Sequence, residues 1–330
     1  MTVSQTQPDG LPDPDIPVMF TGLPRSGTTW LGQLAQRYLD VSALDEGTFM
    51  LWLARQKHRE KSWRDPHELK RFLRLFVASR YYFTLLYNQQ PDEEAIVNRL
   101  VELVTFPTVQ AIGRAVFILT REKLGLPRLG HESPAMMWDP HAVLTVFPHS
   151  RWVHILRDPR DAATSVLKQP WGANNVYVSA KRWNHQVRRM RRIGRDLGTG
   201  RYTEFRYEDL LQEPEATMRS LMAFVCGTVS EEKLRAFLAE SRENPRRANY
   251  GNWRKELSPR QIRLIEGAAR EEMRRTGYRP VTGATGVSVP QAAYWTFHNR
   301  FVQLCRIVSG RLDTTGGAKR LVRRPVTRGD

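Results

Sequence analysis

A glycine-rich turn between a short apolar run and a helical stretch is the feature that most constrains the fold of this chain. Residues 17–23 (PVMFTGL) are mostly apolar, and residues 28–40 (TTWLGQLAQRYLD) place apolar side chains at helical spacing. Gly22 and Gly27 occupy the glycine positions of a G-x-x-x-x-G-K-S/T phosphate-binding loop. Such a loop holds an anion with its backbone N–H groups and the N-terminus of the following helix. The order strand, loop, helix therefore predicts a phosphate-binding loop, and a glycine turn that merely starts a helix is the structural alternative.

The loop lacks the lysine of a nucleoside-triphosphate site. Thr28 stands at the lysine position, Thr29 supplies a second hydroxyl, and Arg25 supplies the cation inside the loop. In P-loop phosphotransferases the lysine compensates the β- and γ-phosphates while Mg²⁺ bridges them. We therefore predict a ligand with one phosphate in the loop and a reactive group near Arg25, without a metal ion.

The remaining predicted strands alternate with helices. Strand-like runs occupy residues 41–46, 128–133, 151–157 and 201–207, and helical stretches separate most of them. This alternation predicts an α/β fold of three layers, the P-loop fold, in which a central parallel sheet is flanked by helices. Residues 66–124 carry no strand signal and predict a mostly helical insertion. Most of its aromatic side chains are expected to pack in a core, and the rest to line an organic acceptor.

The two ends of the chain differ from its middle. Residues 1–16 are polar and proline-rich and lack the pattern of a signal peptide, so a flexible segment is predicted there. Residues 17–285 are predicted to form a single domain, and residues 286–330 an amphipathic helix (291–308) with a basic tail. The absence of a run of about 18 apolar residues predicts that the chain has no transmembrane helix. We expect the terminal helix to pack against the domain, with contact to a membrane surface or a partner as the alternative.

Charge and cysteine content limit the ligand and the compartment. The chain has 51 Lys and Arg against 34 Asp and Glu, a net charge of +17, which favours anionic ligands. Residues 181–195 carry seven of these basic side chains, either as a solvated helix face or as a surface that attracts an anionic donor. No recognition module supports a nucleic-acid partner. Cys226 and Cys305 show neither a disulfide framework nor metal-ligand spacing, so a cytoplasmic location and no metal site are predicted.

A second motif lies in residues 147–168 (FPHSRWVHILRDPRDAATSVLK). An apolar strand ends at Arg157, a turn at Asp158 and Pro159 follows, and Ser165 lies inside the next helix. An arginine at the carboxyl end of a strand and a hydroxyl two helical turns later are suited to bind a second, separate phosphate.

Four segments in order give the sequence its resemblance to the sulfotransferases that use 3′-phosphoadenosine 5′-phosphosulfate (PAPS) as donor. PRSGTTW (24–30) resembles the family's loop for the 5′-phosphosulfate, and RDPRDAATS (157–165) resembles its loop for the 3′-phosphate. RYEDLLQEP (206–214) and GNWRKELS (251–258) resemble two further family segments. The motif style is similar to bacterial and tyrosylprotein-type members. The resemblance implies metal-independent transfer of a sulfuryl group to a hydroxyl, or an amine, of an organic acceptor, with adenosine 3′,5′-bisphosphate (PAP) as product.

The resemblance also implies which residues bind the donor. The 5′-phosphosulfate site is expected to consist of Arg25, Ser26, Gly27, Thr28, Thr29 and Trp30. Arg25 would also steady the leaving phosphate oxygen. Arg157 and Ser165 are expected at the 3′-phosphate, and Tyr207 near the adenine, with a core tyrosine as the structural alternative.

The late segment that closes over the nucleotide departs from the family's pattern. Trp253 and Arg254 match it, but the family commonly has a basic residue before the tryptophan, where this chain has Asn252. Arg246, Arg247 or Arg254 is expected to supply that charge.

Two glutamates are candidates for the general base that transfer to a hydroxyl requires. Glu46 stands 21 residues after Arg25, the spacing of the catalytic glutamate in sulfotransferases that resemble the tyrosylprotein and several bacterial enzymes. Glu132, in HESP, stands where relatives carry lysine or histidine, and strand alternation should point His131 away from its side. We predict Glu46 as the base, ahead of Glu132, which is either a relocated base or an acceptor-positioning residue. A solvated loop glutamate is the alternative for Glu46.

The main prediction is a cytosolic PAPS-dependent sulfotransferase that acts on a small-molecule, lipid or glycan acceptor. One alternative is a P-loop kinase-like phosphotransferase, against which the missing lysine and the motif at 157–165 argue. The other is a non-catalytic, basic nucleotide- or nucleic-acid-binding protein, for which the altered HESP segment leaves room. The identity of the acceptor and the formation of a homodimer stay open.

Overall fold

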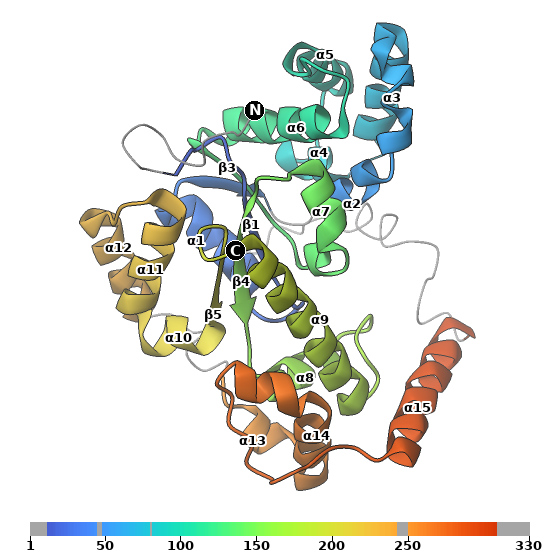
Figure 1. Ribbon diagram of the computed structural model, residues 1–330, viewed down its shortest axis with the longest axis vertical. Helices are drawn as coiled ribbons and strands as arrows, with labels where there is room; N and C mark the ends of the chain where they lie inside the picture. Colours follow the sequence, from blue (N-terminus) through green and yellow to red (C-terminus); the bar gives the residue numbers. More distant parts are fainter. Residues whose placement is uncertain (1–11, 45–47, 80, 243–249, 309–330) are drawn as a thin grey trace, which may run out of the picture. The chain divides into compact units, whose positions relative to one another are not determined.

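The computed structural model describes residues 12–44, 48–79, 81–242 and 250–308 (Figure 1). The chain divides into two compact units, the first made of Met1–Arg157 with Gln186–Tyr250 and the second of Asp158–His185 with Gly251–Asp330. The single domain expected over residues 17–285 stays a prediction. Most of the segment 1–16 lies outside the described residues, as does the basic tail from residue 309.

A five-stranded sheet forms the centre of the first unit, in the order β2-β3-β1-β4-β5. Its strands are β1 (Val18–Gly22), β2 (Val41–Leu44), β3 (Arg128–Glu132), β4 (Arg151–Leu156) and β5 (Tyr202–Arg206). All neighbouring strands are parallel, so their carboxyl ends lie at one edge. The predicted parallel sheet is therefore confirmed.

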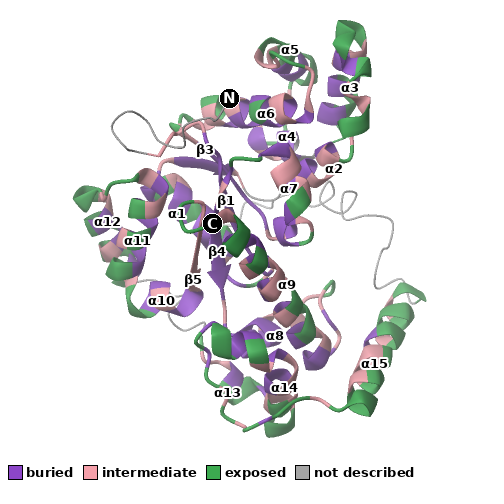
Figure 2. Cartoon of the chain, in the orientation of Figure 1, coloured by how far each residue is buried: buried purple, intermediate pink, exposed green. Residues whose placement is uncertain are grey.

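One face of the sheet is covered by four helices, which are α1 (Thr28–Tyr38), α10 (Tyr207–Gln212), α11 (Pro214–Cys226) and α12 (Glu231–Arg242). Side chains alternate along a strand, so Val18 and Phe20 of β1 share this face with Val153 and Ile155 of β4. All four are buried against the helices, as the colours of the strands show in Figure 2. This layer is the hydrophobic core beneath the glycine loop between β1 and α1.

The other face of the sheet contacts helices from the segment between β2 and β4. These elements are α2 (Phe49–Ala54), α3 (Pro66–Ala78), α4 (Tyr81–Leu86), α5 (Glu93–Leu103), α6 (Val109–Leu124), α7 (Pro140–Val146) and the 3-10 helices Lys57–Arg59, Ser62–Arg64 and Pro134–Met137. The helical insertion predicted at 66–124 is confirmed, since α3 to α6 fill it and its described residues contain no strand. Phe72, Phe76 and Phe83 are buried there, so they pack in a core as expected.

The second unit is helical in its described residues. It contains α8 (Pro159–Leu167), α13 (Trp253–Glu256), α14 (Pro259–Arg275), α15 (Val289–Val308) and the start of α9 (Val176–Leu197), which ends in the first unit. Ser258 and Gln261 form a capping box at the start of α14. Both α13 and α14 pack on α8, so the late motif and the motif at 157–165 meet through this helix.

Candidate active site

The loop between β1 and α1 is held close to its neighbours by its two glycines. Gly27 has a φ of 93°, and a Cβ added there would lie 2.7 Å from the ring of Tyr207. A Cβ at Gly22 would lie 2.6 Å from the carbonyl oxygen of Ile155 in β4. Only glycine satisfies both the left-handed backbone at residue 27 and these close approaches. The loop therefore needs its glycines because the backbone passes directly over β4 and α10.

Hydrogen-bond donors lie in the loop and at the start of α1. Gly27 is the N-cap of α1, and among the described residues no side chain caps the helix. The N–H groups of the first turn are thus left to an anion or to water. Ser26 is fully buried, and its hydroxyl oxygen has no hydrogen-bond partner among the described residues. Arg25 and Thr29 are exposed, whereas Thr28 is buried.

Sheet topology brings Arg157 to this loop. β4 lies beside β1, with Ile155 in register with Gly22, so Arg157 follows β4 where the loop follows β1. The Nη1 of Arg157 donates a hydrogen bond of 2.7 Å to the carbonyl oxygen of Arg25. Two arginines that are separated by 132 residues in the sequence thus lie at the same edge of the sheet.

Tyr207 begins α10 directly after β5 and lies beneath the loop. The guanidinium carbon of Arg157 is 4.8 Å from the centre of its ring, and Trp30 packs edge-on against it at 5.7 Å. Tyr207 and Trp30 are only 3% and 4% exposed. Both belong to the core beside α1, which agrees with the structural alternative for Tyr207. Their contacts with the donor stay predictions.

Of the two predicted general bases, the structure describes Glu132 but not Glu46. Glu46 lies outside the described residues, as do Arg246 and Arg247. Glu132 ends β3 and is fully buried, and its Cβ and Cγ lie 3.2 Å from the position of a Cβ added to Gly32 of α1. Glu132 therefore lies on the side of the sheet that α1 covers.

His131 lies on the opposite side, as strand alternation predicts. Its ring centre is 5.9 Å from that of Phe49 in α2, 5.8 Å from Tyr82 and 6.0 Å from Phe117 in α6. Histidine in this aromatic cluster is a core residue of the insertion side.

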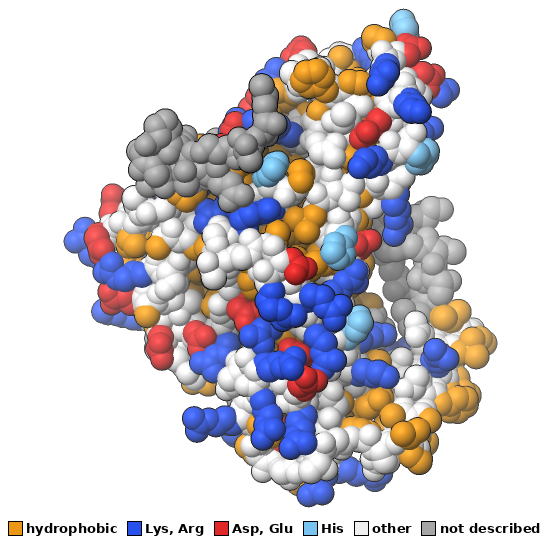
Figure 3. Space-filling model, viewed as in Figure 1, with side chains coloured by type: hydrophobic (Ala, Val, Ile, Leu, Met, Phe, Trp, Pro, Cys, Tyr) orange, Lys and Arg blue, Asp and Glu red, His pale blue; other side chains and the backbone are white. Residues whose placement is uncertain are grey.

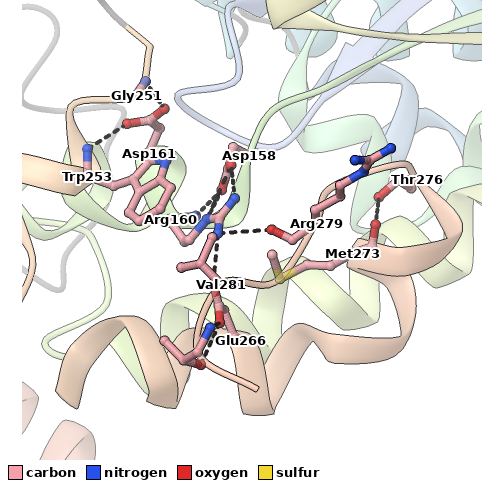
Figure 4. A network of polar contacts seen from close by, with 11 residues as sticks. Asp158, Arg160, Asp161, Gly251, Trp253, Glu266, Met273, Thr276, Arg279 and Val281 are labelled. Atoms are coloured by element: carbon pink, nitrogen blue, oxygen red, sulfur yellow. Dashed lines mark hydrogen bonds and ion pairs between the residues drawn. The ribbon is translucent and has the colours of Figure 1, made fainter. Parts of the chain in front are cut away.

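In the second unit, Asp161 of α8 anchors the segment that carries the late motif (Figure 4). Its carboxylate accepts hydrogen bonds from the backbone N–H groups of Gly251, at 2.6 Å, and Trp253, at 3.0 Å. Asp161 is 1% exposed, and the bond from Trp253 is buried while that from Gly251 is partly buried. Hydrogen bonds to a charged acceptor are stronger than neutral ones. Asp161 therefore fixes the backbone of residues 251–253 against the start of α8.

Arg160 lies at the centre of the same network (Figure 4). It forms ion pairs with Asp158, at 2.6 Å, and Glu266 of α14, at 2.7 Å, and its guanidinium carbon lies 3.9 Å from the ring centre of Trp253. Burial raises the pKa of Glu266, but hydrogen bonds from Thr282, Val281 and Arg160 outweigh it, so the pKa lies below its ordinary value. The network keeps the charges of Arg160, Asp158 and Glu266 paired although all three side chains are buried.

Sequence reasoning missed Arg160 and Asp161 as functional candidates. The signal was present, because the run DPRD puts three charged residues at a helix start. Asp158 caps α8 by accepting the N–H of Arg160, and Pro159 occupies the first turn. The predicted site residues Ser165 and Arg254 belong to the same unit. Ser165 is half-buried on α8, and Arg254 is exposed with its guanidinium carbon 4.4 Å from the ring centre of Trp253.

Basic side chains gather over α9 (Figure 3). Some are occupied by neighbours of the same unit. Arg191 pairs with Glu204 of β5 at 3.0 Å, and Arg189 donates to the carbonyl oxygen of Trp138 at 2.7 Å. The run at 181–195 is therefore partly structural. Among the described residues, no group of three or more His, Cys, Asp or Glu is arranged to hold a metal ion.

Comparison with known proteins adds independent evidence. The family model described as "Sulfotransferase family" matches residues 17–229. A protein-tyrosine sulfotransferase of Drosophila melanogaster is 24% identical over 218 residues, which cover 64% of this chain and 38% of that protein. The chain thus spans well under half the length of this curated relative.

Two solved sulfotransferase domains resemble the chain, and the first of them supports a shared fold. The domain from the curacin biosynthetic pathway is 16% identical, with a TM-score of 0.53 over 81% of this chain and 99% of that domain. The domain from the Synechococcus PCC 7002 olefin synthase is 20% identical, with a TM-score of 0.49 over 81% of this chain and 96% of that domain. Because the family model covers well over half of the sequence, including the glycine loop and Arg157, this chain belongs to the sulfotransferase family.

Proposed function

We propose that this protein transfers the sulfuryl group of PAPS to a hydroxyl, or an amine, of an organic acceptor and releases PAP. The observation that carries the proposal is the meeting of three elements at the carboxyl edge of the sheet. They are the glycine loop with the uncapped start of α1, Arg157 after β4, and Tyr207 after β5. Ligands of open α/β sheets bind at such an edge.

The 5′-phosphosulfate is proposed to lie against the loop. The N–H groups at the start of α1, the buried hydroxyl of Ser26 and the hydroxyls of Thr28 and Thr29 would donate to its oxygens. The partnerless hydroxyl of Ser26 supports this role, because a buried polar group without a partner costs free energy unless a ligand satisfies it. Gly27 would let the anion approach the backbone, with Trp30 below.

The 3′-phosphate is assigned to Arg157 and Ser165 by the motif RDPRDAATS. Transfer of a sulfuryl rather than a phosphoryl group, with Arg25 steadying the leaving phosphate oxygen, would account for a loop without the lysine of a triphosphate site. Tyr207 is proposed near the adenine. Trp253 and Arg254 are proposed to close over the nucleotide, on a segment that Asp161 and Arg160 hold in place.

The transfer step is proposed as an in-line displacement. The acceptor oxygen forms a bond to sulfur, the bond between sulfur and the bridging phosphate oxygen breaks, and the acceptor proton passes to a carboxylate. Glu46 is the proposed base and Glu132 the second candidate. The charge that develops on the leaving phosphate would be stabilised by Arg25, whose exposed side chain lies in the loop.

The acceptor is proposed to be a small molecule, a lipid or a glycan, and the reaction to proceed without a metal ion in the cytoplasm. Free cysteines, Cys226 and Cys305, are consistent with a reducing compartment. Among the described residues, no helix combines the length and the hydropathy needed to cross a bilayer.

Incubation of the purified chain with PAPS and mixed acceptors, in the presence of EDTA, tests the proposal. We expect sulfated products by mass spectrometry, together with an equal amount of PAP, and loss of both with Arg25→Ala. Formation of phosphorylated products from ATP, or the absence of any sulfated product in a screen where PAP binds, would contradict it.

A further inference from the structure

The helix α15 has one face that packs within the second unit. Asn299 is only 6% exposed, and its side-chain oxygen accepts a hydrogen bond of 2.8 Å from the backbone N–H of Asn174. The backbone carbonyl oxygen of Asn299 accepts a second hydrogen bond from the side chain of Asn174. The side chain of Asn175 donates to the carbonyl oxygen of Trp295, at 2.9 Å. Arg306 reaches the carbonyl oxygen of Pro170. These contacts hold one side of α15 against residues 170–175 of the second unit.

The opposite side of α15 carries an exposed apolar stripe, and much of this helix is green in Figure 2. The stripe consists of Tyr294, Phe297, Phe301, Leu304 and Val308, which are 58%, 68%, 55%, 58% and 80% exposed. Their spacing of three and four residues places them in one line along the helix. The periodicity was correctly predicted, but α15 contacts the second unit through its other side, and the apolar stripe is exposed in the described residues. Exposed apolar patches of this kind mark interaction surfaces.

The surroundings of the stripe are basic. Residues 273–312 contain no Asp or Glu, and Arg300 lies next to the stripe on α15. Over residues 286–330 the sequence has eight Lys or Arg and two Asp. Six of those eight follow in the segment after α15, which lies outside the described residues. An apolar face beside a mainly basic segment complements a surface that is apolar within and negatively charged at its boundary.

We propose that α15 docks on an anionic lipid bilayer. The apolar stripe would enter the boundary between headgroups and acyl chains, Arg300 would contact the lipid phosphates, and the basic composition of the sequence after α15 would add electrostatic attraction. Amphipathic helices that combine aromatic and basic residues bind membranes in this way, through apolar burial together with electrostatic attraction. Aromatic side chains favour this boundary.

A second copy of the chain fits the stripe less well. Each copy has a net charge of +17, and pairing two α15 helices would bring two basic segments together. A nucleic acid would match the charge, but its phosphate backbone offers nothing to three exposed rings and two aliphatic side chains. The bilayer accounts for both the stripe and the charge.

Sedimentation of the full chain with vesicles tests the proposal. We expect binding to vesicles of phosphatidylcholine with phosphatidylglycerol, weaker binding at higher salt, and little binding to phosphatidylcholine alone. The double variant Phe297→Ser/Phe301→Ser should bind the anionic vesicles about tenfold more weakly. The matched control is Leu75→Ser/Phe106→Ser, which removes two side chains that are 64% and 71% exposed in the first unit. It should bind as the wild type does.

A second measurement keeps the test independent of the variants. Cys305 is exposed on α15, whereas Cys226 is half-buried, so an environment-sensitive fluorophore on Cys305 in a Cys226→Ser chain reports on this helix. Anionic vesicles should shift its emission to the blue. The proposal is overturned by the absence of vesicle binding, by equal loss in both double variants, or by an unshifted fluorophore. Light scattering that shows a dimer dependent on Phe297 and Phe301 would also overturn it in favour of a second copy.

Discussion

Gly27 and the residues that touch it decide the geometry of the loop at the residue scale. Gly27 combines a left-handed backbone with contact to the ring of Tyr207, and Tyr207 in turn contacts Trp30 and Arg157. The position of the predicted phosphate cradle thus depends on a buried tyrosine. The resemblance places Tyr207 near the adenine, which stays a prediction, and its burial against Gly27 adds a supporting role beneath the loop.

Substitution Gly27→Ala should therefore cost more than backbone strain alone. The matched control is Gly125→Ala at the end of α6, where φ is 66° and nothing lies within 4 Å of an added Cβ. Left-handed strain of roughly 1–2 kcal/mol applies to both. The clash with Tyr207 should add about 1–3 kcal/mol to the loss in unfolding free energy of Gly27→Ala. Equal losses for the two variants in denaturant titrations would contradict the packing described for the loop.

The two arginines of the site should differ in kinetics. Arg157→Ala should raise the KM for PAPS strongly, because it removes a ground-state contact with the 3′-phosphate. Arg25→Ala should lower kcat as well, because charge on the leaving oxygen develops only during transfer. Arg157→Lys serves as a control that keeps the charge but not the planar fork. Indistinguishable profiles for the two alanine variants would refute this division of roles.

The two glutamates can be ranked by their pH–rate profiles. Glu46→Gln keeps the shape but removes proton acceptance, so kcat should fall about 10²- to 10⁴-fold and the acidic limb should disappear, with PAP binding retained. Glu132→Gln should lower kcat less, because Glu132 is buried beside α1. If instead Glu132→Gln loses the acidic limb and Glu46→Gln stays within a few-fold of wild type, the order of the two bases is reversed.

At the scale of elements, α8 connects two segments that carry family motifs. Its first turn supplies Asp158 as a cap, Arg160 as a bridge to α14, and Asp161 as the anchor of residues 251–253. The positions of the late motif and the 3′-phosphate motif are therefore coupled within the second unit. Because Asp161 accepts the backbone N–H groups of Gly251 and Trp253, it should act on ligand binding through the segment that it holds.

Asp161→Asn should weaken PAP binding about tenfold, since a neutral amide replaces the charged acceptor of the N–H groups of Gly251 and Trp253. The control Asp196→Asn changes an exposed aspartate of α9 and should leave the affinity unchanged. Calorimetry measures both. Unchanged PAP affinity in a folded Asp161→Asn chain would show that the 251–253 segment does not contact the nucleotide.

The Arg160–Glu266 pair makes stability depend on pH. The pKa of Glu266 is lowered on folding from an ordinary value of 4.5, so its stabilisation is present above that value and is lost as the pH falls through the folded pKa. Glu266→Gln should reduce the unfolding free energy by about 1–3 kcal/mol at pH 7, and the difference should shrink in acid. Glu256→Gln, which breaks an exposed pair with Lys168, is the control and should cost at most about 1 kcal/mol. A difference that grows as the pH falls would contradict the lowered pKa.

At the scale of the whole molecule, short sequence patterns predicted the elements of the fold, but not the contacts between residues that are far apart in the sequence. The strand–loop–helix order, the parallel sheet, the helical insertion and the capping box of α14 all follow from short-range signals. The network around α8 was not predictable in this way, since Asp161 and Gly251 are 90 residues apart and Arg160 and Glu266 are 106 apart. Periodicity likewise revealed the stripe on α15 but not that it faces outward.

The donor is the central claim, and calorimetric titration with nucleotides tests it most directly. Two phosphates held by separate arginines predict that PAP binds far more tightly than AMP, in the presence of EDTA. Each lost charge-assisted contact should remove roughly 1.5–3 kcal/mol of binding free energy, which is about a tenfold to hundredfold change in Kd. The account predicts this preference and no gain from Mg²⁺. Equal affinities for PAP and AMP, or tighter binding of ATP with Mg²⁺, would contradict it.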